Sequence, residues 1–229
     1  DVFKSFGVTF EWALISIPLG LVLSFMLALL ASKEVKGVGV YRLLFYMPTI
    51  IPSIAISFIW ADTFSSDGLA NQLLLSLGLP PSMWLEGEST ALWTLILTGV
   101  WGIGGNMIMW LASLRNIPPE LYEAASLDGA GYFTNLFRIT IPLCTPMIFY
   151  NLLNALIGAM QAFDVYAMGG HGPNDSLYFI SIRIYETAFG SGNEYGLACA
   201  MGWLMFAVIA VLTLIMFKTN NWVNYGEES

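Results

Sequence analysis

Charged residues are scarce in this sequence. Lys, Arg, Asp and Glu make up 10% of the 229 residues, whereas a soluble domain normally carries about 25%. Hydrophobic residues make up 57%, and the mean hydropathy is +0.70. This balance favours a membrane protein over a soluble one, and the length fits a single domain.

Several kinds of reactive group are also rare or absent. The net charge of −8 gives no support for nucleic-acid binding. Cys144 and Cys199 lie in apolar sequence without a second Cys or His at metal-ligand spacing, which favours packing roles. The single histidine, His171, lies in a Gly-rich segment, so neither a metal site nor a catalytic constellation is indicated, and no cofactor is expected. No GxxxxGK[ST] sequence occurs, so the chain cannot bind ATP by that route.

The sequence contains long apolar runs without charged residues. A helix rising ~1.5 Å per residue needs about 20 residues to cross ~30 Å of hydrocarbon. Five runs are near or above that length and contain no Asp, Glu, Lys, Arg or His: Trp12–Ser32, Leu43–Ala61, Ser89–Leu114, Ile139–Phe163 and Tyr195–Phe217. We therefore predict an all-α membrane protein with five transmembrane helices, at about residues 12–32, 43–63, 90–114, 141–163 and 196–217. Pro48 and Pro52 are expected to kink the second of these spans.

Basic residues predict the orientation of these spans. If the first span runs from outside to inside, six basic residues lie inside, namely Lys33, Lys36, Arg42, Arg115, Arg138 and Lys218. Only Lys4 and Arg183 then lie outside. This orientation agrees with the positive-inside rule, by which cytoplasmic loops carry an excess of Lys and Arg. The C-terminal segment Lys218–Ser229 is then cytoplasmic. The chain starts at Asp1 without a basic, apolar leader, so we expect an upstream portion to be missing.

Two loops have a predicted structure of their own. In the outer loop Ser65–Thr90, the apolar stretch Asn71–Leu77 between glycines predicts a short helix at the membrane surface. In the inner loop Arg115–Arg138, Pro119 suits the first turn of a helix because the amide that it lacks would be unpaired there. Gly129 predicts the end of that helix, since glycine accepts the left-handed conformation found at many helix ends.

The inner loop also carries a specific motif. The stretch Glu123-Ala124-Ala125-Ser126-Leu127-Asp128-Gly129 is followed, after nine residues, by Ile139-Thr140-Ile141-Pro142. It resembles the EAA loop of ABC importer permeases, in which EAA, Gly, Ile and Leu-Pro recur at this spacing. Ile141 replaces the preferred Leu, which is a mild change at an apolar position.

The resemblance extends along nearly the whole chain and implies a fold and partners. Residues 41–60, 101–118 and 163–173 are similar to segments of carbohydrate-type permeases, although His171 interrupts the family's Thr-Gly-Gly-Gly-Pro. It implies a type I importer bundle over residues 1–229 with the family's first span missing. The implied partners are a separate ATP-binding subunit, a second and different permease, an extracytoplasmic solute-binding protein and membrane lipid. Segment 115–140 would be the loop that couples to the ATPase, through Glu123, Ala124, Ala125, Asp128 and Gly129.

Polar residues inside the apolar runs suggest a solute pathway. Asn151, Asn154, Gly158 and Gln161 are spaced by three, four and three, so they share one face of the fourth predicted span. Amides are costly in lipid, so this face should point into the protein, where it would bind sugar hydroxyls or join helices. Trp101 and Asn106 are further candidates in the third span, because aromatic rings stack on sugar rings.

Other functions remain possible at this stage. The chain could be an ABC permease for a solute other than a sugar. An ion-coupled secondary carrier is also polytopic, but it usually needs ionisable residues within its spans, and the five runs contain none of the charged types. A membrane-embedded enzyme would need a catalytic constellation, which the sequence does not offer.

Overall fold

The computed structural model describes residues 1–33 and 36–223, and within these residues all regular structure is helical. The part of the predicted cytoplasmic tail that follows Val223 therefore lies outside the described residues. Short helical turns η1, η2, η4, η5 and η6 occupy Met47–Ile50, Trp84–Glu86, Asp164–Met168, Pro173–Asp175 and Asn220–Trp222, and Leu136–Thr140 (η3) is a π-helical turn. The α-helices are α1 (Val2–Ser32), α2 (Val38–Tyr46), α3 (Ser53–Thr63), α4 (Leu69–Ser76), α5 (Glu88–Val100), α6 (Gly104–Arg115), α7 (Pro119–Leu127), α8 (Tyr132–Asn135), α9 (Ile141–Leu143), α10 (Thr145–Met160), α11 (Ile180–Phe189) and α12 (Tyr195–Lys218).

Each predicted span has a counterpart, but three of them are bent. By length and composition, α1 and α12 could each cross a membrane, and up to five segments could do so if each bent helix pair is one span. The pairs are Val38–Ile50 with Ser53–Thr63, Glu88–Val100 with Gly104–Arg115, and Tyr132–Leu143 with Thr145–Met160, bent by 94°, 49° and 65°. A kink was predicted for the second span only, and the bends in the third and fourth were not predicted. The number of spans stays a prediction.

The helix that contains the first predicted span is longer than the span itself. Helix α1 begins at Val2, ten residues before the uncharged run, and contains Lys4 and Glu11. Charged residues interrupt a hydrophobic run, but they are good helix formers and do not end a helix. Helix α12 begins at Tyr195 and ends at Lys218, so it contains the last predicted span, 196–217.

The sharpest bend lies between the two prolines of the second predicted span. The backbone is extended at Ile51 and Pro52, with ψ of 133° and 132°, and α3 starts directly afterwards. Proline lacks the amide hydrogen of a helical bond and disfavours a helical conformation in the residue before it. The break at this position was predicted, and it turns the chain by about a right angle.

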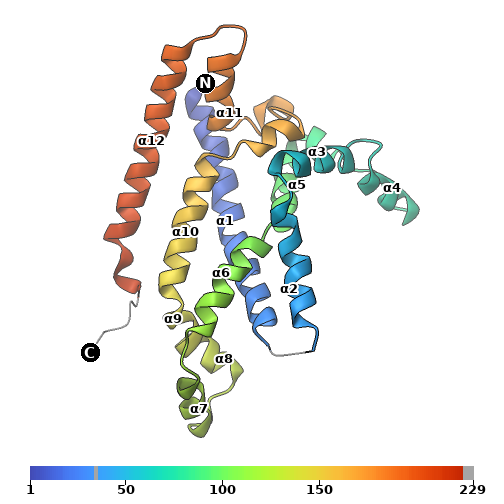
Figure 1. Cartoon of the computed structure of the whole chain (residues 1–229). Coiled ribbons are helices and arrows are strands. Elements are labelled where there is room, and N and C mark those ends of the chain that lie inside the picture. Colours follow the sequence, from blue (N-terminus) through green and yellow to red (C-terminus); the bar gives the residue numbers. More distant parts are fainter. Residues whose placement is uncertain (34–35, 224–229) are drawn as a thin grey trace.

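Helix α1 is the centre of the bundle, and it packs against α5, α6, α10 and α11 (Figure 1). Ala28 and Ala31 are buried near its end, together with Met107 and Trp110 of α6. Small residues allow such close helix contacts. In Figure 1, α12 lies at the rim of the bundle, and among its residues only Ala198 and Met201 are buried. Few buried residues are expected in a helix that faces lipid, since its apolar side chains can contact lipid instead of protein.

One contact brings two backbones together. A Cβ atom added to Gly104, at the start of α6, would overlap the carbonyl group of Phe45 in α2. Only glycine fits at such a contact. The two bent pairs that contain α2 and α6 are therefore joined at this point.

The bundle has two different ends, named here after the helices that mark them. At the α7 end, α7 and α8 project beyond the other helices (Figure 1). At the α4 end lies α4, which matches the predicted surface helix. Asn71 holds this segment: its amide Nδ2 donates to the carbonyls of Ser66 and Ser82, both at 3.0 Å, and its Oδ1 accepts from Trp84 Nε1 at 2.7 Å.

Candidate functional site

The predicted coupling segment folds as a capped helix. Pro119 is at the first turn of α7, as the sequence predicted. After Leu127 the chain turns back: Gly129 has φ of +77°, and the amide of Ala130 donates to the carbonyl of Ala125 at 2.9 Å. This positive φ is the conformation in which glycine is preferred over other residues. Both ends of α7 are thus determined by its own sequence.

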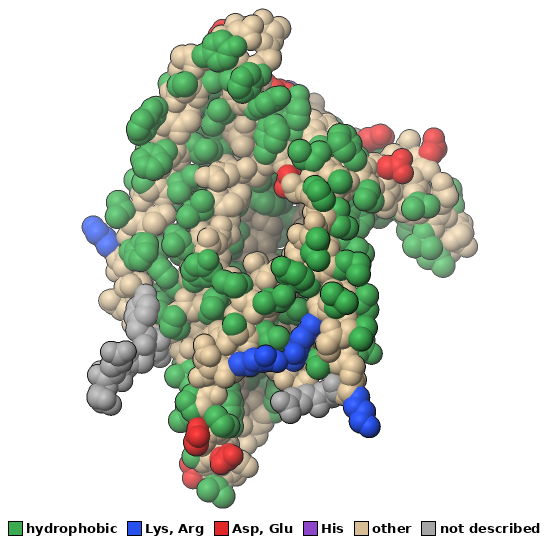
Figure 2. All heavy atoms as spheres, in the orientation of Figure 1, with side chains coloured by type: hydrophobic (Ala, Val, Ile, Leu, Met, Phe, Trp, Pro, Cys, Tyr) green, Lys and Arg blue, Asp and Glu red, His purple; other side chains and the backbone are tan. Residues whose placement is uncertain are grey.

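The outer surface of α7 is acidic and partly apolar. Glu123 and Asp128 are exposed, and within the described residues neither carboxylate forms an ion pair. Leu127 is 91% exposed, Ala124 is exposed and Ala125 is half-buried. Figure 2 shows acidic side chains on this projecting tip. Unpaired carboxylates beside an exposed leucine are suited to bind a partner with a basic rim and an apolar pocket.

The inner side of α7 is anchored to the bundle. The hydroxyls of Tyr122 and Thr140 share a hydrogen bond of 2.9 Å. Tyr122 also packs against the cluster that contains Ile117, Trp110 and Cys144. Thr140 ends the π-helical turn, and such turns often occur at functional positions.

The same cluster continues from α7 to α1. Trp110 of α6 is 2% exposed, and its Nε1 donates to Ser24 Oγ of α1 at 2.9 Å. Phe25 meets the Trp110 ring edge-on, with 5.2 Å between ring centroids. Close-packed side chains transmit displacement because they cannot be compressed. A force on α7 would therefore reach α1.

A groove lies where α1 is flanked by α5, α6 and α10. It has a volume of about 250 Å³, and its lining includes Ser16, Gly20, Gly99, Asn106, Ala155 and Gly158. The face seen in Figure 2 is hollowed between α10 and the side of the molecule formed by α2 and α5. The lining is mostly apolar with a few polar groups, as in many small-molecule sites.

The predicted pathway residues occupy three different environments. Asn106 lines the groove, as does Gly158 of α10. Asn151 is buried, and its Nδ2 donates to the Met147 carbonyl at 3.0 Å. Asn154 and Gln161 are exposed on this chain, and Asn154 Nδ2 donates to the Tyr150 carbonyl at 2.8 Å. The structure thus brings Asn106 to the groove and leaves Asn154 of α10, and Gln161 directly after this helix, on the surface.

Trp101 lies apart from this groove. It is 55% exposed and meets Trp60 edge-on, with 5.8 Å between ring centroids. Trp60 lines a second cavity of about 190 Å³, whose lining also includes Trp12 and Asp164. Both cavities share Trp12, Leu95 and Gly99 in their linings. Trp12 and Trp60 were not among the predicted pathway residues, because nothing in their spacing relates the first span to the second.

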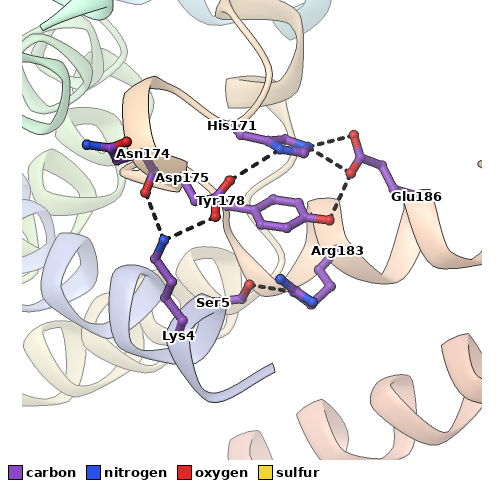
Figure 3. Close-up of polar contacts among 8 residues, drawn as sticks. All are labelled: Lys4, Ser5, His171, Asn174, Asp175, Tyr178, Arg183 and Glu186. Atoms are coloured by element: carbon purple, nitrogen blue, oxygen red, sulfur yellow. Dashed lines mark hydrogen bonds and ion pairs between the residues drawn. The ribbon is translucent and has the colours of Figure 1, made fainter. Parts of the chain in front are cut away.

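A polar network closes the α4 end (Figure 3). His171 Nε2 lies 2.8 and 2.7 Å from the two carboxylate oxygens of Glu186, and its ring stacks on Tyr178 with 3.8 Å between centroids. Tyr178 donates its hydroxyl to Glu186 at 2.8 Å, and Lys4 Nζ donates to Asp175 Oδ2 at 3.1 Å. The network ties the start of α1 to α11, and this role of His171 was not predicted from the sequence.

Two pKa values are displaced in this network. Burial, and then the hydrogen bond to Glu186, raise the pKa of Tyr178 to about 12. The hydrogen bond from Lys4 lowers the pKa of Asp175 below its ordinary value. At neutral pH, Tyr178 therefore remains a hydrogen-bond donor and Asp175 remains charged.

Known proteins share this sequence and architecture. A family model described as "Binding-protein-dependent transport system inner membrane component" matches residues 16–225. The chain is 39% identical over 228 residues to the probable ABC transporter permease protein YesP of Bacillus subtilis, covering 97% of this chain and 74% of that protein. It is 31% identical over 214 residues to the trehalose/maltose transport system permease protein MalF of Thermococcus litoralis, covering 92% and 72%.

A solved structure shares the fold. It is a crystal structure of a bacterial alginate ABC transporter in complex with an alginate pentasaccharide-bound periplasmic protein, and one of its chains matches with a TM-score of 0.86 and 24% identity. The match covers 96% of this chain and 78% of that chain. The fold is thus that of the ABC importer permeases, and the chain belongs to the family of inner-membrane components of binding-protein-dependent transport systems.

Proposed function

We propose that this permease forms one side of the membrane pathway for a sugar or sugar-like solute, driven by ATP hydrolysis in a separate subunit. The observation that carries the proposal is the continuous packing from α7 through Trp110 to α1, which forms part of the groove lining. The chain itself is then no enzyme, and its role is mechanical.

Coupling would act through the acidic tip. Glu123 and Asp128 offer charges to a basic surface of the ATPase subunit, while Ala124 and Ala125 allow a close approach of the two backbones. Gly129 fixes the turn at the end of α7, so the helix is presented as a rigid element. When the ATPase subunits close on nucleotide, displacement of α7 would shift α6 and α1 and thereby reshape the groove.

The solute assignment rests on the groove and on the relatives. Asn106 supplies an amide that can both donate to and accept from hydroxyl groups, among apolar and small residues. Relatives named for trehalose and maltose support a sugar as the solute. The exposed Asn154 of α10, and Gln161 directly after this helix, would face the pathway once a second permease covers this side.

The partners follow from the same arrangement. The groove is open on one side of this chain, so a second permease would complete the pathway, and we propose a different chain for that role. A solute-binding protein would deliver solute at the α4 end, which the positive-inside rule places outside. Single cysteines at Ser126 and Ser76, in a background without Cys199, test the topology. An impermeant thiol reagent should label Ser76→Cys in intact cells and leave Ser126→Cys unlabelled, and the reverse pattern would refute the proposed orientation.

Replacing amides by leucine tests the pathway. Asn106→Leu, Asn154→Leu and Gln161→Leu should each raise the KM for uptake, or change the preferred sugar, because one or two hydroxyl contacts at roughly 1 kcal/mol each are lost. Gln72→Leu is the matched control, since Gln72 is an exposed amide on α4 away from the groove. Unchanged kinetics in all three variants across a panel of sugars, at normal membrane levels, would mean that these amides only support the helices.

A further inference from the structure

A third cavity lies where α7 and α8 meet the ends of α1 and α6. Its volume is about 400 Å³, which is within the range of small-molecule pockets. Its lining comes from the last turns of α1 and α6, from Tyr122 of α7 and from the segment that contains α8 and η3. It shares no residue with the groove or with the cavity beside Trp60. This cavity therefore lies apart from the predicted pathway.

The lining of this third cavity carries positive charge. Lys33 directly follows α1 and Arg115 ends α6, and both side chains are exposed. Within the described residues, neither cation forms an ion pair, and no Asp or Glu belongs to the lining. In Figure 2, basic side chains lie above the acidic tip of α7. The cavity behind α7 is thus opposite in charge to the outer surface of the same helix.

The ends of the helices account for only part of this charge. A cation near the last turn stabilises a helix dipole. At the end of α1, Arg42 already supplies this cation, because its Nε and Nη2 atoms donate to the Ala31 carbonyl at 3.1 and 2.6 Å. The same contact reduces the repulsion that the end of α1 would exert on an anion in the cavity. Lys33 is therefore available for an anionic ligand.

The rest of the lining indicates the kind of anion. Tyr132 is 60% exposed and adds a hydroxyl group. The apolar walls are Leu29, Leu114 and Leu136. Arginine pairs with two oxygens of one phosphate, and lysine adds a second positive charge. A neutral sugar would leave both cations unpaired, and a metal ion would be repelled. We propose that this cavity binds a phosphate group with an apolar or ring-shaped remainder, held by Lys33 and Arg115.

Two sources can supply a phosphate group at this position. In the proposed orientation the α7 end is cytoplasmic, and basic pockets on this side of a membrane bind the head groups of anionic phospholipids. A soluble phosphorylated sugar would reach the same cavity from the cytoplasm. Both ligands present the same chemistry to Lys33 and Arg115, so they are separated by the choice of probe.

A ligand in the third cavity would act on α7. One phosphate would join the ends of α1 and α6, and the 2.9 Å hydrogen bond between Tyr122 and Thr140, which anchors α7, belongs to the same lining. A bound phosphate would therefore favour one position of α7 relative to α1. This consequence rests on the proposed coupling through α7, whereas binding can be measured without transport.

Native mass spectrometry of the purified complex of both permeases and the ATPase subunits tests the site. Dioctanoylphosphatidylglycerol and glucose 6-phosphate are titrated separately, and adducts are counted on this permease alone, so that phosphate bound by the ATPase is not included. The double variant Lys33→Gln/Arg115→Gln should bind one or both probes at least about tenfold more weakly, because two charge-assisted contacts are lost.

A matched control separates the site from general surface charge. The double variant Lys36→Gln/Arg138→Gln removes the same charge from exposed residues outside the lining, and should bind like the wild type. The exchange Lys33→Arg/Arg115→Lys keeps both charges and should recover binding that the Gln variant loses. Weaker binding of the lipid or of the sugar phosphate identifies the source. Equal affinities of the two Gln double variants for both probes would overturn the proposal.

ATP hydrolysis then tests the effect on α7. The complex is placed in phosphatidylcholine vesicles with and without phosphatidylglycerol, or with glucose 6-phosphate on the ATPase side. The probe that binds should raise solute-stimulated hydrolysis about fivefold in the wild type and in the matched control, and leave the Lys33→Gln/Arg115→Gln variant unchanged. Absence of solute-stimulated hydrolysis under every condition would refute the proposed function, while the binding titration still decides the site. Equal stimulation of the two Gln double variants would overturn the effect on α7.

Discussion

The two ends of the bundle are held together in different ways. At the α4 end, Lys4, Asp175, His171, Tyr178 and Glu186 form a connected network that joins the start of α1 to α11. At the α7 end, the described residues give α7 a single side-chain hydrogen bond to the bundle, from Tyr122 to Thr140, and its carboxylates are unpaired. The network at the α4 end pairs its charged side chains with one another, whereas the carboxylates of α7 are left for a partner. Variants at the two ends should therefore fail in different assays.

The largest effect is expected at the turn after α7. Gly129→Val would force a β-branched residue to φ of +77°, at a cost of about 1–2 kcal/mol, and Glu123→Lys would reverse a charge offered to the ATPase. Uptake should fall by more than about tenfold with either change, through loss of ATPase binding or of solute-stimulated hydrolysis. Co-purification and ATPase assays in reconstituted vesicles measure this.

Two observations make that result interpretable. Both variants should reach normal levels in the membrane, because an added Cβ at Gly129 meets no atom within 4 Å and Glu123 is exposed. Glu88→Lys, at the α4 end, reverses an exposed charge away from α7 and should leave ATPase binding intact. If the double variant with both α7 changes keeps full solute-stimulated hydrolysis and uptake, α7 is not the coupling element.

The α4 end should fail in stability instead. Glu186→Ala leaves His171 and Tyr178 without their shared acceptor, at a cost of roughly 1–2 kcal/mol. The Tm of the purified complex should fall by about 2–4 °C per kcal/mol, while uptake per folded complex stays close to the wild type. Glu194→Ala is the control, as Glu194 is exposed at the same end. Equal Tm values for the two variants would mean that the network adds no stability.

A milder change at the α7 end sharpens the contrast. Tyr122→Phe removes the hydroxyl that bonds Thr140 and keeps the ring in its cluster. The lost bond is worth roughly 1 kcal/mol, so the ratio of sugar imported to ATP hydrolysed should fall by up to about fivefold. Thr187→Val removes a comparable hydroxyl in α11, which donates to the Arg183 carbonyl, and should leave this ratio unchanged. An unchanged ratio in Tyr122→Phe would show that α7 is coupled by packing alone.

The smallest effect is expected for the exposed ion pair. Asp175→Asn should alter stability by no more than about 0.5 kcal/mol, because both side chains are largely exposed. The pKa of Asp175 is lowered, so its contribution is present above the pKa of the unfolded chain and is lost as the pH falls through the folded value. The Tm difference between the variant and the wild type should therefore shrink as the pH falls below about 4, where the Asp175 carboxylate becomes protonated. A difference that stays unchanged down to about pH 2 would assign the effect to another group.

Features encoded by neighbouring residues could be predicted from the sequence. The start of α7 at Pro119 and the left-handed turn at Gly129 were both predicted from residue type. The surface helix α4 and the break near Pro52 were also predicted, since breakers act within one turn. These predictions hold because the backbone preference of one residue determines each of them.

Features assembled from distant residues could not be predicted. The groove combines α1, α5, α6 and α10, and the helical spacing of Asn151, Asn154 and Gln161 did not indicate that the first would be buried and the others exposed. His171 had no apparent partner, because Glu186 lies 15 residues further along the chain. Such pairs depend on tertiary packing, which no local pattern contains.

The contact between Gly104 and Phe45 limits how the groove could be altered. On the α10 side, an added Cβ at Gly158 meets no atom within 4 Å, so larger side chains there can narrow the groove without moving the backbone. At Gly104, even a methyl group would separate α6 from α2. Engineering of a new solute preference should therefore vary Gly158 on α10 and keep Gly104 fixed, because an added side chain is accommodated at the first position and not at the second.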